Sequence, residues 1–137
     1  MTIYATLSDI IERAGEDEIL QVADRDRDGV ADPDVIDAAI ATAGSEIDGY
    51  ISVRYRLPLP AVPNLIKTWA VSIARYHLHI NGAPDHVVRD WKAAMDGLRD
   101  VARSVINLPV DEAGSQPVDG AGRVILVKPR MDFGGFL

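Results

Sequence analysis

Apolar residues recur every three or four positions through three long segments of this chain, and this periodicity constrains its fold more than any other feature. The segments run from about residue 33 to 55, from 64 to 81 and from 84 to 107. Such spacing places apolar side chains along one face of a helix. A proline-rich turn at residues 58–63 separates the first two segments, because proline does not fit inside a helix. The three segments are therefore predicted to be helices of an antiparallel bundle.

Two shorter helices are predicted ahead of this bundle. Thr6 and Asp9 are spaced as a capping box, in which each side chain bonds the backbone amide of the other residue, and they predict a helix over residues 8–14. Gly15 is typical of a helix end. The acidic start of the next segment suits the positive end of a second helix, over residues 16–23.

The last 30 residues follow a different pattern. Residues 111–122 are rich in glycine, serine, proline and acids and predict a loop, whereas residues 123–128 form a β-type run. A single strand cannot satisfy its own backbone groups, so it needs a partner. We therefore predict an all-α fold. A bundle of three longer and two short helices forms a domain over residues 1–107, and an extended C-terminal arm, residues 108–137, contains one short β-strand.

Charge is divided unevenly along the chain, whose net charge is −7. Residues 1–50 hold 13 acidic and 3 basic residues, whereas residues 51–107 hold 4 acidic and 8 basic ones. One interpretation is two solvated faces of a single subunit. The other is that the acidic part of one copy meets the basic part of the next, and such a head-to-tail contact closes into a ring when the rotation allows it. The chain as a whole lacks the basic surface that nucleic-acid binding needs.

An acidic loop carries the sharpest local signal for a ligand. Asp24, Asp26 and Asp28 stand at positions 1, 3 and 5 of a sequence with glycine at 6 and Asp32 at 9, which is how an EF-hand calcium loop begins. The twelfth position is Val35, where an EF-hand supplies a bidentate glutamate. Two interpretations stay open. One is a weak calcium site held by these four aspartates. The other is an acidic turn closed by its own side chains, with Asp32 capping the next helix.

No other group of residues predicts a cofactor or catalysis. The chain has no cysteine, which excludes disulfides and thiolate chemistry, and no serine stands in a nucleophile elbow. His77 and His79 are two positions apart on a predicted helix and point to different faces, so they are not expected to share a metal. Arg54, Arg56 and Arg75 are expected on solvated helix faces, with contact to a partner as the alternative. We therefore expect no enzyme.

Neither a membrane span nor a signal peptide is predicted. The chain has no run of about 18 apolar residues, the length that would suggest a span. Its first seven residues lack a basic region ahead of an apolar stretch. These features are expected of a protein made in the cytoplasm.

The order of these features resembles one phage protein family. Residues 4–10 read Tyr-Ala-Thr-Leu-Ser-Asp-Ile and precede the acidic loop. Residues 46–59 contain Ile-Asp-Gly-Tyr-Ile and then Arg-Tyr-Arg-Leu-Pro-Leu, and this segment is the most specific part. Residues 73–76 read Ile-Ala-Arg-Tyr, and residues 98–101 read Leu-Arg-Asp-Val. Over residues 3–107 the chain is similar to the Mu-like phage and prophage head–tail adaptor family of neck, or head-completion, proteins.

The resemblance implies a mainly helical structural protein of the virion neck, made in the host cytoplasm and without catalysis. It implies a homo-oligomeric ring, a dodecamer, beneath the portal protein, which the ring joins to a tail-side neck or tail-completion protein. The resemblance does not imply calcium binding. The acidic loop supports a different function, that of a calcium-binding helical regulatory module with a degenerate EF-hand-like loop, and this is the alternative to the structural role. An acidic ring lumen would let DNA pass without specific binding, since like charges repel.

The C-terminal arm is the part expected to contact partners. Its apolar and basic side chains have no core of their own, and its strand could pair with a neighbouring copy or with the portal. The residues expected to make these contacts are Arg123, Val124, Leu126, Lys128, Arg130, Phe133, Phe136 and Leu137.

Overall fold

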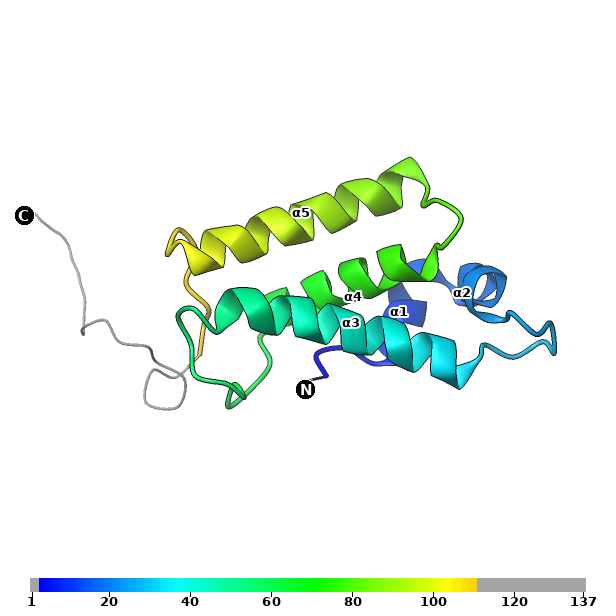
Figure 1. Ribbon diagram of the computed structural model, residues 1–137, viewed down its shortest axis with the longest axis horizontal. Coiled ribbons are helices and arrows are strands. Elements are labelled where there is room, and N and C mark those ends of the chain that lie inside the picture. The colour runs from blue at the N-terminus through cyan, green and yellow to red at the C-terminus, as the bar shows by residue number, and fades with distance from the viewer. Residues whose placement is uncertain (1–2, 111–137) are drawn as a thin grey trace, which may run out of the picture.

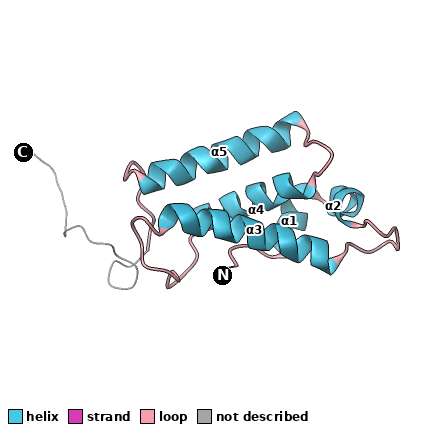
Figure 2. Cartoon of the chain, in the orientation of Figure 1, coloured by secondary structure: helices cyan, strands magenta, loops and turns pink. Residues whose placement is uncertain are grey.

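Three long helices and two short ones make up the part of the chain that the computed structural model describes, residues 3–110. No strand occurs in this range, and the expected all-α bundle is confirmed there (Figures 1 and 2). The predicted arm and its short strand, from residue 111 onward, lie outside the described residues. The helices are α1 (Leu7–Ala14), α2 (Glu16–Ala23), α3 (Pro33–Ile51), α4 (Asn64–Leu78) and α5 (Asp85–Ala102).

Helix α4 lies at the centre of the fold. The long helices run antiparallel to their neighbours along the chain, and α4 packs against α3, α5 and α1 (Figure 1). Seven consecutive residues of α4, from Trp69 to Arg75, are buried. A helix that is buried all round in this way must be covered on more than one side, so α4 is the element on which the others are assembled.

The helix starts follow the local signals in the sequence. Thr6 caps α1, and the reciprocal capping box is present, with the Thr6 amide donating to Asp9 over 2.9 Å and the Asp9 amide donating to the Thr6 hydroxyl over 3.3 Å. Helix α1 begins at Leu7, one residue earlier than predicted. Asp32 is the N-cap residue of α3, and Pro33 opens the helix.

The ends of the three long helices were predicted too late in the sequence. Helix α3 ends at Ile51 rather than near Tyr55, because Tyr55 turns into the core and its hydroxyl accepts a hydrogen bond from the Leu108 amide over 3.0 Å. Helix α4 ends at Leu78 rather than near Asn81, because the His79 side chain turns away to a carboxylate.

Helix α5 ends at Ala102 rather than near residue 107. Ser104 adopts a left-handed backbone with φ of 68°, and the amides of Val105 and Ile106 turn back to the carbonyl of Asp100. Val105, which lies beyond this helix end, is 67% exposed as a result. The chain then returns to the core at Leu108, which is buried.

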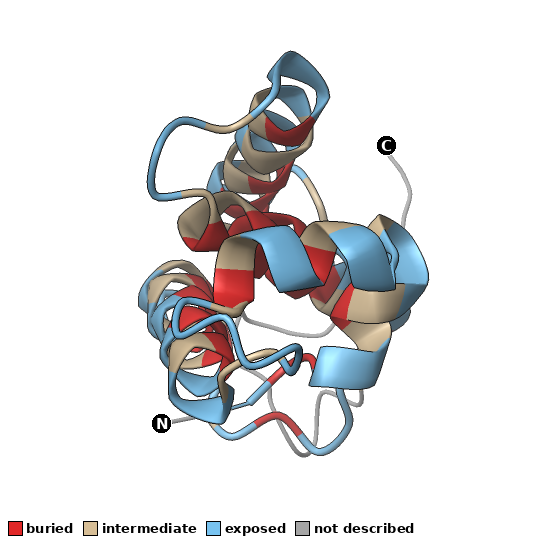
Figure 3. Ribbon diagram, turned by 90° about the vertical axis from the view of Figure 1, so that its right-hand side faces the viewer, coloured by how far each residue is buried: buried red, intermediate tan, exposed pale blue. Residues whose placement is uncertain are grey.

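The core lies between the three long helices and extends under the two short ones (Figure 3). Trp69 is buried, and Trp91 is half-buried and stacks on Tyr76 with 4.2 Å between ring centroids. Gly97 allows α5 to approach α4 closely, since a Cβ atom there would lie 2.3 Å from the Trp69 ring. Among residues 3–110, no helix combines the length and the apolar character needed to cross a membrane.

Candidate functional site

The acidic loop connects α2 to α3 and is closed by main-chain contacts at its base. The Asp32 amide donates to the Ala23 carbonyl over 2.9 Å, and the Arg25 amide donates to the Asp32 carboxylate over 3.1 Å. Gly29 has φ of 86°, in the left-handed region that favours glycine, and makes the tight turn possible. The Asp32 side chain therefore closes the loop and does not bond a helix amide, although its backbone stands at the N-cap.

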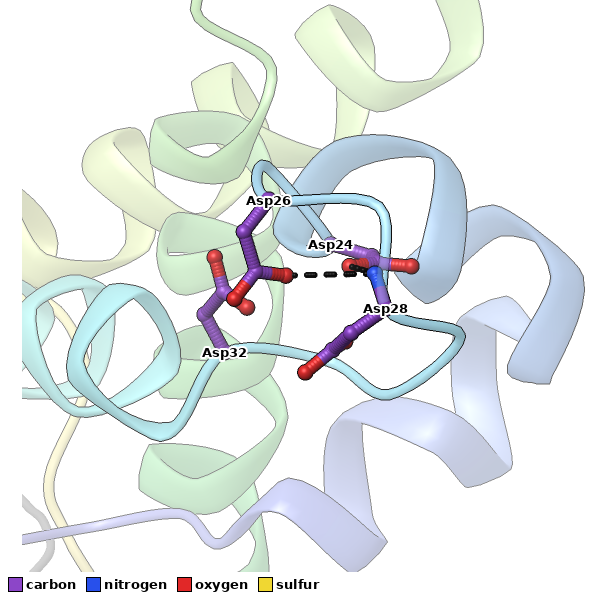
Figure 4. A group of neighbouring side chains, drawn as sticks. All are labelled: Asp24, Asp26, Asp28 and Asp32. Atoms are coloured by element: carbon purple, nitrogen blue, oxygen red, sulfur yellow. Dashed lines mark hydrogen bonds between the residues drawn. The ribbon is translucent and has the colours of Figure 1, made fainter.

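Four carboxylates converge in this loop (Figure 4). One oxygen from each of Asp24, Asp26, Asp28 and Asp32 lies within 4.8 Å of the others. The same carboxylates also hold the turn. Asp24 accepts bonds from the amides of Asp28 and Gly29, over 3.0 and 2.8 Å, and Asp28 accepts one from the amide two residues ahead over 2.9 Å. Side-chain turns were one of the two interpretations of this sequence, and these bonds support it.

The pKa values in the loop are shifted in opposite directions. Partial desolvation, the hydrogen bond with Asp24, and the charges of Asp28 and Asp32 raise the pKa of Asp26 to about 6. For Asp24, desolvation acts to raise the pKa, but the amide hydrogen bonds from Gly29 and Asp28 outweigh it and lower the pKa. Crowded carboxylates share protons unequally in this way, because like charges close together cannot all ionise easily.

Calcium binding by these four aspartates stays a prediction. Val35 stands on α3 at the twelfth position of the EF-hand-like sequence and offers no carboxylate there. If the loop binds calcium, millimolar calcium should raise the melting temperature of the chain, because a ligand that binds only the folded state stabilises it. The control is Asp34→Asn, which changes a neighbouring carboxylate outside the loop and should leave the shift unchanged. A melting temperature that calcium does not move would exclude the site.

A buried ionic cluster links α2, α4 and the start of α5. Arg75 on α4 is only 6% exposed and forms a bidentate pair with Glu18 on α2, with its Nε and Nη2 atoms 2.6 and 2.7 Å from the two carboxylate oxygens. His79 donates from Nε2 to Glu18 over 3.1 Å, and Arg75 also approaches His86 Nε2 at 3.4 Å. The expectation that Arg75 lies on a solvated face is therefore wrong.

The pKa of Glu18 reflects this environment. The hydrogen bonds from Arg75, together with the bond from His79, lower this pKa to about 2, although burial opposes them. The pKa of Arg75 is raised in turn, chiefly by its bonds to Glu18. The pair is thus ionised over the whole neutral range and acts as a fixed connection between α2 and α4.

His77 and His79 bond different carboxylates. His77 Nε2, on α4, lies 2.9 Å from Glu46 on α3, whereas His79, the residue after α4, bonds Glu18 on α2. The two side chains diverge as predicted, although only His77 stands on the helix. His77 is half-buried and connects α4 to α3.

Arg54 fastens the end of α5 to the end of α3. Its Nη1 atom donates to the carbonyls of Val101 and Ile106, both over 2.9 Å, and its Nη2 atom donates to the side chain of Asn107 over 2.6 Å. The expectation of a solvated face is wrong for Arg54 as well. Arg56, two residues later, is exposed as expected.

An apolar groove of about 650 Å³ runs between the N-terminal segment and the first half of α3. Ile3, Ala5 and Leu7 form one wall, and Ile36 and Ile40 are prominent in the other. No single sequence pattern predicted this groove, because its walls come from two segments that are 30 residues apart and become neighbours only in the folded chain.

The acidic and basic halves of the chain meet partly within one subunit. Lys67 lies 3.6 Å from Asp9, in addition to the bonds of Glu18 and Glu46 to α4. Some of the charge complementarity seen in the sequence is therefore used inside the fold. The partner-contacting residues predicted in the arm all lie outside the described residues: Arg123, Val124, Leu126, Lys128, Arg130, Phe133, Phe136 and Leu137.

Comparison with known proteins places this helical chain among phage proteins. Residues 4–126 match the family described as Bacteriophage Mu, Gp36. The Mu-like prophage FluMu protein gp36 of Haemophilus influenzae is 30% identical over 112 residues, which cover 82% of this chain and 79% of that protein. Gene product J of Escherichia phage Mu is 28% identical over 99 residues, which cover 72% of this chain and 70% of that protein. The chain therefore belongs to the Bacteriophage Mu Gp36 family.

Proposed function

We propose that the chain is a structural subunit of the connector between the head and the tail of a tailed phage. In this proposal twelve copies form a ring in the neck of the virion, beneath the portal protein and above a tail-side neck protein, and the subunit performs no catalysis. The observation that carries the proposal is membership of the Mu Gp36 family, joined to the resemblance of residues 46–59 to head–tail adaptors.

The described fold has properties that such a subunit needs. A ring subunit must be rigid, and the buried pair of Arg75 and Glu18 ties the short helix α2 to the central helix α4. A ring subunit also needs surfaces for its neighbours, and the apolar groove beside α3 offers one. Residues 1–50 hold most of the excess negative charge, which suits a lumen through which DNA passes without binding.

Electron microscopy of the chain mixed with the purified portal of the same genome tests the proposal. We expect an added twelvefold ring beneath the portal. The matched control is the chain shortened after Val110, because Leu108 is buried in the core and Val110 packs against it, so that an earlier cut would damage the bundle. The shortened chain should keep its helical circular dichroism and form no ring. Bare portals at a large excess of the full chain, in the presence of the tail-side neck protein, would contradict the proposal.

A further inference from the structure

The apolar groove beside α3 has the properties of a docking surface. Its volume of about 650 Å³ lies in the range of binding sites on proteins. Ile3 on its rim is 63% exposed and Leu7 is 36% exposed, so two large apolar side chains meet water there. Contact with an apolar occupant would remove these side chains from water, which favours a complex. An occupant with apolar side chains therefore fits the floor and walls.

The charges at the groove specify the occupant further. Asp37 is the one charged residue that lines the groove in the described part of the chain, and Asp34 stands one helical turn before it. Neither carboxylate forms an ion pair with another residue between 3 and 110. A fitting partner therefore presents basic residues beside apolar ones.

The chain itself contains a segment of this composition. Residues 123–130 read Arg-Val-Ile-Leu-Val-Lys-Pro-Arg, which is four apolar residues bounded by bases on both sides. Further apolar residues follow at Met131, Phe133, Phe136 and Leu137. From residue 123 to the last residue there are three basic residues and one acid, so the segment is complementary in charge to Asp34 and Asp37.

The position at which the described chain ends favours a neighbouring copy as the acceptor. Leu108 is bonded to Tyr55, four residues beyond the C-terminal end of α3, whereas the groove is lined by the N-terminal half of that helix. The twelve residues from 111 to 122 span at most about 40 Å, more than the roughly 29 Å length of α3, so this length allows the segment to reach a groove on its own chain or on a neighbour. A segment that leaves from one end and a groove at the other form a heterologous pair of surfaces, the kind that closes a ring.

We propose that residues 123–137 of one copy bind in the apolar groove of the next copy. This inference rests on the proposed ring and names the contact that joins its subunits. Apolar residues of the segment fill the space between the N-terminal segment and α3, and its basic residues pair with Asp34 and Asp37.

Crosslinking between two single-cysteine variants tests the proposal, because the natural chain has no cysteine. One full-length variant carries Ala38→Cys on the exposed edge of the groove, and the other carries Val127→Cys. The two are mixed, with and without the portal, and treated with a short bismaleimide. We expect a covalent heterodimer at a yield about tenfold above that of the control pair, in which Ala93→Cys replaces the groove cysteine. Ala93 is also exposed but stands on α5, which does not line the groove.

A charge reversal checks that the crosslink reports the proposed contact. Replacing Asp34 and Asp37 with lysine should lower the yield about threefold to tenfold, as expected for a few weak ion pairs. Replacing Arg123, Lys128 and Arg130 with glutamate in the second chain should restore it.

Three results would overturn the inference: equal yields for the groove pair and the control pair, crosslinking of Val127→Cys to the portal alone, or crosslinking only within one chain when both cysteines are present. A twelvefold ring beneath the portal without the heterodimer would support the proposed function and contradict this contact. A heterodimer without any ring would support the contact between copies and contradict the proposed function.

Discussion

Arg75 shows that the chemical type of a residue can predict the wrong environment for its side chain. An arginine on a helix is usually solvated, yet this side chain is almost fully buried and held by both oxygens of Glu18. A usable signal was present in the sequence, because residues 69–74 read Trp-Ala-Val-Ser-Ile-Ala and predict a helix covered on all sides. A charged residue next to such a run needs a buried partner. The identity of that partner could not be predicted, since Glu18 is 57 residues away.

Glu18→Gln should destabilise the chain by about 3–5 kcal/mol, because it leaves the buried guanidinium of Arg75 without a counter-charge. Chemical denaturation followed by circular dichroism measures the loss. The double variant Glu18→Gln with Arg75→Met should be more stable than the single variant, since it removes the stranded charge. Asp96→Asn breaks an exposed pair with Arg99 and should change stability by less than about 0.5 kcal/mol. If Glu18→Gln and Asp96→Asn lowered the free energy of unfolding equally, the buried pair of Glu18 and Arg75 would not stabilise the fold more than an exposed pair does.

The same carboxylate predicts a pH dependence. The folded chain holds the pKa of Glu18 at about 2, below its ordinary value of 4.5, so Glu18 binds fewer protons when folded than when unfolded. Its contribution to stability is complete above about pH 4.5 and is lost as the pH falls toward 2. Unfolding free energies measured from pH 6 to pH 2 should therefore fall more steeply for the natural chain than for the double variant, which lacks this carboxyl. Parallel curves would show that Glu18 does not titrate in this way.

At the scale of the elements, helix starts were predictable and helix ends were not. The starts depend on signals within one turn, such as the capping pair of Thr6 and Asp9 or the sequence Asp32-Pro33. The ends depend on residues that leave the helix to meet distant partners. Tyr55 turns toward Leu108, and His79 turns toward Glu18. No periodicity within the helix contains that information, so the apolar pattern appeared to continue past each end.

The candidate sites divide in a similar way. The acidic loop was recognised because its four aspartates lie within nine residues of one another, and their spacing alone brings them together. The groove, the Arg75 cluster and the Arg54 contacts join segments that are far apart in the sequence. These contacts are properties of the packing, and no pattern within one segment of the sequence predicts them.

The crossing of α4 and α5 depends on one glycine. Gly97→Ala places a methyl group 2.3 Å from the rigid ring of Trp69, so the helices must separate or the ring must move. We expect a loss of about 1–3 kcal/mol, the usual cost of overpacking, although alanine is the better helix former. Gly49→Ala on α3 is the matched control, because nothing lies within 4 Å of a Cβ atom there, and it should stabilise the chain by about 0.5–1 kcal/mol. Thermal unfolding of both variants measures the difference, and stabilisation by Gly97→Ala would show that the two helices can separate at no cost.

For the molecule as a whole, the two ends of the described chain differ in structure. The end formed by the turn after α3 and the residues after α5 is held by Arg54, which bonds two carbonyls and the side chain of Asn107. The proposed docking groove lies along the other half of α3. The position of the last described residues, before residue 111, is therefore fixed relative to the helices.

Arg54→Lys should loosen the attachment of these last described residues. Lysine keeps the charge but lacks the planar fork that reaches several acceptors at once. We expect faster hydrogen exchange at the amides of Ile106, Leu108 and Val110, with a smaller change in α4. Arg56→Lys alters an exposed arginine two residues away and is the control. Unchanged exchange at Leu108 would show that its bond to Tyr55 alone holds this end.

The order in which the helices pack has a consequence for the speed of folding. Helix α3 packs on α4, and α4 packs on α5, so the most extensive helix contacts join elements that are neighbours along the chain. Chains rich in contacts between neighbouring helices fold rapidly, often within milliseconds. The chain should therefore reach its folded state by a first-order process that is independent of concentration. Formation of the proposed ring would then be a later process, whose rate rises with the concentration of the folded chain.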